Sequence, residues 1–175
     1  MYNNITISGR ICTGKSTLFS HLQKKLGWST FSASQFFRDY AKIHSVSLQK
    51  AEEQNMKLTR DVDLGMQKRL KEESHVILEG WMAGIVADAF PGTLRVLLTC
   101  DDAERIRRMA KRENISEKEA QQKITEREES WIAKLETIYH RSDFFDPKNY
   151  NLVIDTTQST PDKIVSIVLA HLKSP

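Results

Sequence analysis

Short runs of apolar and β-branched residues recur along the chain and predict five strands. They lie at about residues 4–7, 28–31, 75–79, 94–99 and 151–155. Segments with helical spacing separate these runs, and strands that alternate with helices are typical of a parallel sheet. The sequence therefore predicts an α/β fold in which helices cover both faces of the sheet.

The first helical stripe directly follows the first strand. Leu18, Leu22 and Leu26 recur every fourth residue, and Gly27 marks the end of that helix. A second helix is predicted over 33–44, with a buried face formed by Phe36, Tyr40 and Ile43. The segment 47–72 is long and polar and contains Gly65, so it is expected to form two helices or a bent one, in the manner of a movable flap.

Three further helices are predicted after the fourth strand. The first spans 102–113, with Ala103, Ile106 and Ala110 on one face. The second begins at a capping box, Ser116 to Glu119, and carries a stripe of Ile124, Trp131, Leu135 and Ile138. The last begins with Thr160 as N-cap and Pro161 in the first helical position.

Composition adds limits to this picture. A chain of 175 residues suffices for one domain, and no apolar run or leader segment points to a membrane or to export. The net charge of +3 is smaller than nucleic-acid binding usually requires. Two cysteines without metal spacing and five scattered histidines indicate a cytoplasmic protein without a histidine or cysteine metal site.

The strongest chemical signal is the stretch from Gly9 to Thr17, which we call the phosphate loop. It reads Gly9-Arg10-Ile11-Cys12-Thr13-Gly14-Lys15-Ser16-Thr17 and fits the P-loop pattern G-x-x-x-x-G-K-[ST] between a strand and a helix. Its N–H groups are expected to bind phosphates, helped by the helix dipole. Lys15 would add a positive charge, and the Ser16 hydroxyl would ligate Mg²⁺. All nine residues are therefore predicted to bind ATP.

An acidic residue, Glu79, ends the third strand. Ligands of parallel sheets lie beyond the carboxyl ends of the strands, so Glu79 is expected to face the site that the phosphate loop opens onto. There it would hold Mg²⁺, directly or through water, or orient an acceptor. The alternative is a structural acid that pairs with a lysine.

Basic residues follow the fourth strand at helical spacing. Arg105, Arg108 and Arg112 lie on one helix, and Arg127 and Lys134 on the next. Phosphoryl transfer requires cations around the reacting phosphate and the exclusion of water, so this helical hairpin is predicted to be a closing lid. The alternative is two solvated helix faces whose arginines pair with nearby glutamates.

Cys12 lies inside the phosphate loop, where N–H groups and Lys15 would favour a thiolate. A redox-sensitive thiol and a small filler residue are both compatible with this position. A disulfide with Cys100 is not expected in a reducing compartment.

Taken together, these pieces resemble the nucleoside monophosphate kinases, and most closely the short, archaeal-type cytidylate kinases. The resemblance runs nearly end to end. Besides the phosphate loop, it is carried by residues 31–38 (FSASQFFR), 76–80 (VILEG), 105–113 (RIRRMAKRE), 126–130 (EREES) and 152–155 (LVID).

The resemblance implies a single P-loop kinase domain over 1–175, with three α/β/α layers and a sheet in the order 2-3-1-4-5. It implies an acceptor-binding segment at about 32–70 and a lid at about 111–130. The implied reaction moves the ATP γ-phosphoryl group to CMP or dCMP with Mg²⁺, in a monomer that acts on small nucleotides without nucleic-acid or membrane partners. Lys15, Glu79, Arg112 and Arg127 would be catalytic, Arg108 would contact ATP, and Arg38 would hold the acceptor phosphate.

The sequence departs from the family at the acceptor side. Trp81 stands where the family has an arginine for the acceptor phosphate, and Asp63-Leu64-Gly65 stands where it has Asp-Arg-Arg. Trp131 replaces an acidic residue, and Lys134 an arginine, which keeps the charge and loses the bidentate fork. Asp63, Trp81 and Lys134 are still expected around the acceptor, and Arg10 is a candidate replacement cation.

These departures leave more than one function open. The first is a cytidylate-type kinase, and the second is a kinase of another small acceptor on the same scaffold. The third is a regulatory protein that binds ATP without catalysis, against which the intact Lys15, Ser16 and Glu79 argue. Nucleic-acid binding through 105–112 is the weakest alternative, because acidic residues accompany that basic run.

Overall fold

The computed structural model describes residues 2–48 and 56–173. Five parallel strands form one sheet, with bounds β1 (Asn4–Gly9), β2 (Ser29–Ser32), β3 (Val76–Glu79), β4 (Thr93–Thr99) and β5 (Leu152–Asp155). Their order is β2-β3-β1-β4-β5, as the family resemblance implies. All five predicted strands are confirmed, and β1 is two residues longer than expected because it continues to Gly9 beside Leu98 of β4.

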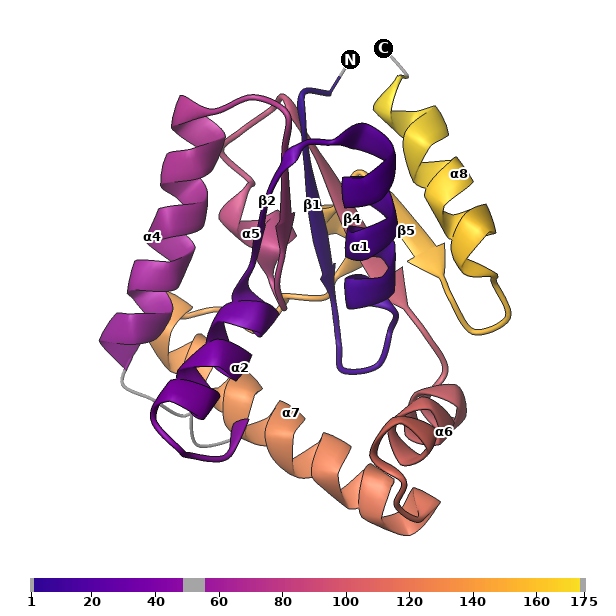
Figure 1. The fold of residues 1–175 in the computed structure, drawn as a ribbon. Coiled ribbons are helices and arrows are strands. Elements are labelled where there is room, and N and C mark those ends of the chain that lie inside the picture. The colour runs from indigo at the N-terminus through magenta and orange to yellow at the C-terminus, as the bar shows by residue number, and fades with distance from the viewer. Residues whose placement is uncertain (1, 49–55, 174–175) are drawn as a thin grey trace.

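Helices cover both faces of the sheet (Figure 1). On one face, α1 (Lys15–Leu26) and α8 (Pro161–Leu172) pack on alternate strand residues such as Ile5, Ile7 and Ile77. On the other face, α4 (Met56–Glu72) and the short α5 (Ala83–Val86) pack on Val76 and Leu78. This alternation follows from the two-residue period of a strand, and it confirms the covered parallel sheet.

Sequence signals fix most helix ends correctly. Gly27 ends α1 in the left-handed conformation at φ 65°, and Thr160 caps α8 through Lys163 N–H. The Ser116 capping box is present at the start of α7 (Glu117–Tyr139), and the predicted stripe of that helix is buried. A four-residue helix, α5, and a short 3-10 helix, η1 (Pro147–Asn149), carry no sequence signal long enough to predict.

The buried face of α2 (Ala33–Ile43) differs from the prediction. Ala33, Phe37 and Ala41 face the core, Phe36 and Tyr40 are half-buried, and Ile43 is 78% exposed. The helix packs closely through its two alanines, and Ile43 lies at its outer end. The apolar stripe of the sequence was therefore misplaced by one residue.

The helix α4 continues through Gly65 without a break. The expected division of segment 47–72 does not occur within α4, and residues 49–55 of that segment lie outside the described residues. Within Met56–Glu72, the buried side chains Thr59, Val62, Asp63, Met66 and Leu70 recur at helical spacing and face α5 and β3.

The helices α2, α6 (Asp102–Glu113) and α7 lie around the edge at which the strands end (Figure 1). In α6 the buried residues are Arg105 and Met109, whereas Ala103 is exposed and Ile106 and Ala110 are half-buried. Ile106 and Ala110 of the predicted apolar face pack against the core, but Ala103 does not, and Arg105 is buried more deeply than any of the three. Within residues 2–48 and 56–173, no helix is both long and apolar enough to cross a membrane.

Candidate active site

The phosphate loop connects β1 to α1 at the edge where the strands end. Gly9 has φ 147°, and a Cβ there would lie 2.5 Å from the Leu98 carbonyl oxygen. Gly14, at φ 94°, precedes α1 as an N-cap without a side chain, so no side-chain cap occupies the first N–H groups of the helix. This geometry leaves the helix start available to an anion, as the motif predicts.

Lys15 is the best-defined cation of the site. Its side chain is buried, its Nζ donates to the Arg10 carbonyl at 2.8 Å, and it stands 5.7 Å from the centre of the Trp81 ring. Burial lowers the pKa of this amine, and the negative charge of Glu79 opposes the shift. A bound phosphate would add further negative charge beside Lys15 and would oppose the shift in the same direction as Glu79.

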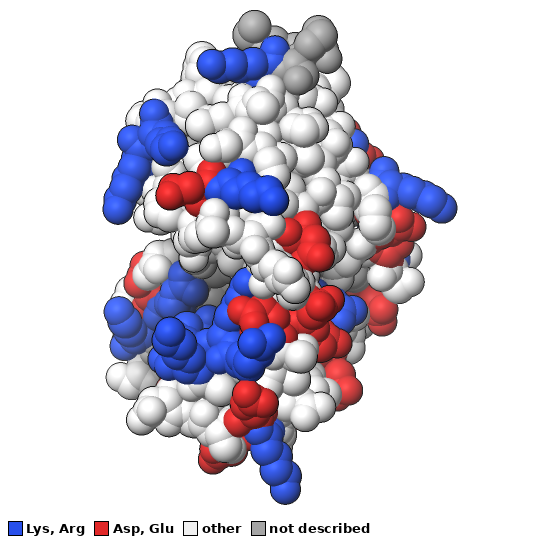
Figure 2. All heavy atoms as spheres, turned by 90° about the vertical axis from the view of Figure 1, so that its right-hand side faces the viewer, with Lys and Arg blue, Asp and Glu red and all other residues white. Residues whose placement is uncertain are grey.

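A cavity of about 640 Å³ opens in front of the loop. Five cationic side chains and two carboxylates are among the residues that line it: Lys15, Arg38, Arg108, Arg112, Arg127, Glu79 and Glu113. Figure 2 shows Lys and Arg side chains gathered along one side of a hollow on this part of the molecule. A surplus of positive charge suits a polyanionic ligand such as a nucleotide.

Glu79 lies at the floor of this cavity and is fully buried. Its carboxylate accepts hydrogen bonds from the hydroxyls of Ser32, at 2.5 Å, and Ser34, at 2.9 Å. The carboxylate is therefore oriented by the segment that begins α2, and its hydrogen-bond partners are hydroxyls rather than a lysine. Neither serine was predicted from the sequence, although Ser32 ends β2 and Ser34 lies two residues further on, at the same edge of the sheet.

The residues present fit a magnesium ion that is bound together with nucleotide phosphates. The Ser16 side chain lines the cavity in the first turn of α1, and Glu79 lines the same cavity. Among the described residues, no group of three His, Cys, Asp or Glu side chains could hold a metal alone. Mg²⁺ usually keeps several waters and takes one or two protein ligands plus phosphates, so this donor set is suitable.

The predicted lid arginines divide into two groups. Arg108, Arg112 and Arg127 line the cavity, but Arg105 does not. Arg105 is buried and donates to the Ile11 carbonyl at 2.8 Å, and it also pairs with Glu128. The expectation that Arg105 belongs to a lid or to a solvated face was therefore wrong, because the phosphate loop itself binds this side chain.

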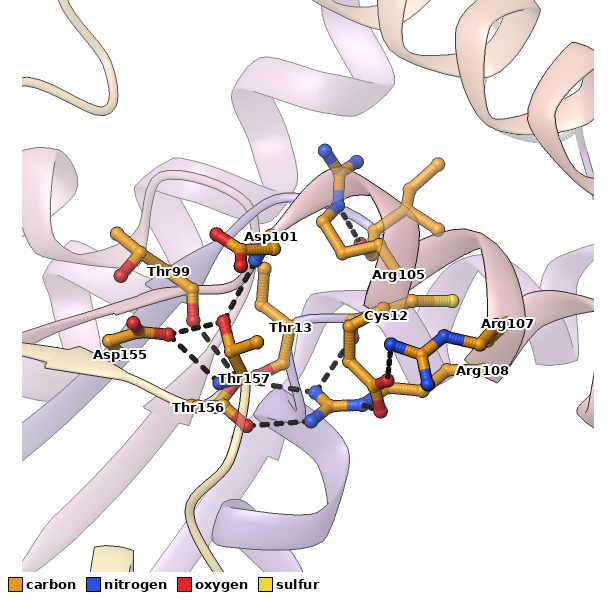
Figure 3. A network of polar contacts seen from close by, with 12 residues as sticks. Cys12, Thr13, Thr99, Asp101, Arg105, Arg107, Arg108, Asp155, Thr156 and Thr157 are labelled. Carbon is orange, nitrogen blue, oxygen red and sulfur yellow. Dashed lines mark hydrogen bonds and ion pairs between the residues drawn. The ribbon is translucent and has the colours of Figure 1, made fainter.

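A smaller hollow of about 230 Å³ continues from the loop toward the end of β5. Gly14, Arg108, Thr156 and Pro161 line it. Arg108 donates to the Thr156 carbonyl at 2.6 Å and to the Cys12 carbonyl at 3.2 Å, so it joins the phosphate loop to the segment after β5 (Figure 3). This hollow could receive the nucleoside part of a nucleotide whose phosphates lie on the loop.

Thr156 was missed from the sequence. It is almost completely buried, and its hydroxyl lies within hydrogen-bond distance of the Thr13 carbonyl, at 2.9 Å, and the Thr99 carbonyl, at 3.0 Å. The strand signal ends at Asp155, and no pattern indicates that the next residue contacts the loop 143 positions earlier.

Only some of the residues expected around the acceptor line the cavity. Arg38 and Trp81 line the cavity. Asp63 instead accepts a hydrogen bond from Tyr139 and lines a separate hollow of about 250 Å³, and Lys134 lies 5.0 Å from the centre of the Trp131 ring. Neither Asp63 nor Lys134 is among the residues that line the cavity.

Two tryptophans occupy the positions where the family resemblance led us to expect an arginine and an acid. The rings of Trp81 and Trp131 have centroids 6.2 Å apart, and Phe37 packs against Trp131 at 5.5 Å. Two aromatic rings therefore pack together where the family has an arginine and an acidic residue, and of the two only Trp81 lines the cavity.

Arg10 was a candidate replacement cation, but it faces away from the cavity. Its guanidinium lies 3.7 Å from the Glu128 carboxylate and 5.6 Å from the centre of the Phe145 ring. Neither Arg10 nor Thr13 is among the residues that line the cavity, and the side chain of Thr13 donates back to the Arg10 carbonyl. The Arg10 side chain therefore contacts Glu128 and Phe145 and does not enter the cavity.

The environment of Cys12 opposes the thiolate that the sequence favoured. Burial raises the pKa of this thiol, and the positive charges of Arg112 and Lys15 reduce the shift without reversing it. Cys12 and Cys100 are both free cysteines in the structure.

We expect Asp63 to make folding stability depend on pH. Burial raises the pKa of Asp63 to about 6, and the Tyr139 hydrogen bond opposes the rise. Because this folded-state pKa exceeds the unfolded value, the proton stabilises the folded protein below about pH 4, and this contribution is lost as the pH rises through 6. Relative to Asp63→Asn, the wild-type free energy of unfolding should fall by up to about 3 kcal/mol between about pH 4 and pH 7.

Urea denaturation of both proteins across this pH range would measure the difference. Asp61→Asn is the matched control, because Asp61 is exposed on the same helix. Parallel stability curves for wild type and Asp63→Asn would contradict the prediction.

The amino-acid sequence is similar to those of known proteins. A model of the cytidylate kinase-like family matches residues 60–158. The cytidylate kinase of Sulfurisphaera tokodaii is 33% identical over 175 aligned positions, covering 96% of this chain and 94% of that protein. The cytidylate kinase of Pyrococcus abyssi is 36% identical over 172 positions, covering 96% and 92% respectively.

Solved structures bear on the fold. The shikimate kinase of Aquifex aeolicus superposes with a TM-score of 0.58 at 15% sequence identity, covering 97% of this chain and 96% of that one. A sequence identity of 15% supports a shared fold and carries no conclusion about function. The P-loop kinase-like α/β fold expected from the sequence is thereby confirmed.

Proposed function

This chain belongs to the cytidylate kinase-like family, and from that membership we propose that it transfers the γ-phosphoryl group of ATP to a nucleoside monophosphate, CMP or dCMP. The observation that carries the proposal is one cavity in which Lys15, Ser16 and Glu79 lie together with Arg38, Arg112 and Arg127. Phosphoryl transfer depends on positioning and on charge stabilisation, and this set of side chains supplies both.

On the donor side, the proposal assigns the ATP phosphates to the phosphate loop and the start of α1. Lys15 would neutralise the β- and γ-phosphates, because its ammonium has three donors and its bond to the Arg10 carbonyl uses one of them. Arg108 and the hollow that it shares with Thr156 and Pro161 would hold the nucleoside.

Around the transferred group, Arg112 and Arg127 would stabilise the charge that develops on the phosphoryl oxygens. Both come from the hairpin of α6 and α7, so closure of a lid over about 111–130 would bring them nearer and exclude water. A bound Mg²⁺ would supply positive charge that neutralises part of the phosphate charge. The Ser16 hydroxyl, and Glu79 through water, would hold it.

On the acceptor side, the segment 32–70 would supply Arg38, whose guanidinium would bind the acceptor phosphate. Trp81 would form a wall of the same pocket, as a stacking surface or as a closure. We assign no direct acceptor contact to Asp63 or Lys134, because they lie outside the lining of the cavity.

A kinase of a different small acceptor is the second candidate function. Trp81 favours it, because an indole replaces the guanidinium that the family pattern provides for the acceptor phosphate. Loss of one charged hydrogen-bonding partner typically costs about 1.5–3 kcal/mol when nothing compensates for it.

The test is ADP release from Mg·ATP with a panel of CMP, dCMP, UMP, AMP and GMP. We expect CMP or dCMP to give the highest kcat/KM, with the Lys15→Ala variant as the blank. ATP binding without turnover of any monophosphate would exclude the first candidate and favour the second. We also propose that the protein is a monomer. Its molar mass, measured by light scattering during size-exclusion chromatography, would test this.

A further inference from the structure

A buried ion pair holds the phosphate loop from the side opposite the cavity. Arg105 of α6 pairs with Glu128 of α7, and both side chains are bound to Ile11 in the loop. Glu128 accepts the Ile11 N–H at 3.0 Å, and Arg105 donates to the Ile11 carbonyl at 2.8 Å. All three residues are buried, so we call this group the Ile11 clamp.

The three side-chain nitrogens of Arg105 and both carboxylate oxygens of Glu128 each have a polar partner. Besides Ile11 and Glu128, Arg105 binds Asp102 at 2.6 Å, and the second oxygen of Glu128 lies 3.7 Å from Arg10. Removing one partner of a buried pair leaves an uncompensated charge, so each side chain depends on the other. The two helices of the predicted lid thus both bind the loop at Ile11.

The clamp fixes the orientation of two successive peptide groups. In a trans peptide, the C=O and the N–H point to opposite sides. Glu128 takes the Ile11 N–H, so the Arg10 carbonyl of the same peptide points the other way, and there it accepts the hydrogen bond from Lys15. The catalytic lysine is therefore placed through the peptide that Glu128 holds.

The peptide between Ile11 and Cys12 is oriented in the same way. Arg105 takes the Ile11 carbonyl, so the N–H of Cys12 in that peptide points away from Arg105. Cys12 lines the cavity and has φ 62°, a region that residues other than glycine rarely adopt. Such a backbone persists only where its surroundings hold it, and the clamp provides contacts on the preceding residue.

We propose that Arg105 and Glu128 are positioning residues that hold the phosphate loop in its phosphate-binding conformation before the nucleotide arrives. Neither touches the substrates. Their effect reaches ATP through the peptides on either side of Ile11 and through Lys15. The inference rests on the proposed function only in that the loop binds ATP, and it does not depend on the identity of the acceptor.

Two variants test the clamp, one at Glu128 and one at Arg105. Glu128→Gln keeps the size and an acceptor for Ile11 N–H but removes the charge that Arg105 requires. Arg105→Lys keeps the charge but loses the planar fork that reaches Ile11, Asp102 and Glu128 together. Glu129→Gln is the matched control, because it makes the same change at an exposed neighbour on the same helix.

We expect both variants to bind Mg·ATP about tenfold more weakly in calorimetry without any acceptor. Exchange of the Ile11 amide hydrogen, followed by NMR in the absence of nucleotide, should accelerate by about tenfold or more relative to wild type. Glu129→Gln should match wild type in both measurements.

A purely structural ion pair would lower the melting temperature of both variants while leaving ATP affinity and Ile11 exchange unchanged, and that result would overturn the inference. If instead no nucleoside monophosphate is turned over but Glu128→Gln still weakens ATP binding, the proposed function fails and the clamp stands.

Discussion

Replacing Lys15 with alanine is expected to reduce kcat for phosphoryl transfer by about a hundred- to a thousandfold. The buried ammonium is the cation at the start of α1, and its loss removes charge stabilisation that matters most as the phosphoryl group moves. The measurement is kcat at saturating Mg·ATP and acceptor, with circular dichroism and thermal melting to establish that the fold is retained.

Lys24→Ala is the matched control, since it removes an exposed lysine from the same helix and should leave kcat unchanged. Because burial lowers the pKa of Lys15 in the free protein, wild-type kcat/KM for ATP should also begin to fall at a pH below the usual range of lysine. Equal turnover by Lys15→Ala and wild type would remove the catalytic assignment.

The second large effect is expected at Arg38. Its alanine variant should raise KM for the acceptor by about ten- to a hundredfold, while KM for ATP changes by less than about twofold. Arg38 comes from α2 and lines the cavity from an element other than the phosphate loop. Initial rates over a grid of both substrates would separate the two constants.

Lys42→Ala serves as the control for Arg38, because Lys42 is exposed one turn further along α2. Comparable increases in KM for both substrates would contradict an acceptor role and would point to a general effect on the site. With Trp81 in place of a second guanidinium, the dependence on Arg38 should be strong.

The donor half of the site could be predicted because its signals are local. Gly9, Gly14, Lys15 and Ser16 are fixed by one motif, and the strand and helix around them follow from short apolar patterns. Glu79 could be placed as well, because the carboxyl ends of parallel strands share one edge. The sheet order came from the family resemblance and is confirmed.

The role of Arg105 could not be predicted, because helical spacing places it with Arg108 and Arg112. Its side chain is buried only because a loop carbonyl 94 positions earlier accepts its hydrogen bond. In the same way, Thr156, Ser32 and Ser34 act through partners on distant segments. Periodicity reports which face of an element is apolar, and it carries no information on polar side chains that are buried by a specific partner.

The acceptor half was predicted least well for a related reason. Trp81 and Trp131 are 50 positions apart, and each was an isolated departure from the family pattern. The structure brings their rings together, so the two departures form one aromatic contact. The family resemblance led us to expect Asp63 near the acceptor, but Asp63 accepts a hydrogen bond from Tyr139 and does not line the cavity.

The hydroxyl of Ser32 restricts which residues can occupy that position. Its oxygen accepts the Gln35 N–H as the N-cap of α2, and it donates its proton to Glu79. Aspartate would cap the helix equally well but would set a second carboxylate against Glu79. Alanine would lose both bonds. Of the residues that cap helices well, only serine and threonine accept and donate through one atom, so a library of variants at position 32 should return these two almost alone.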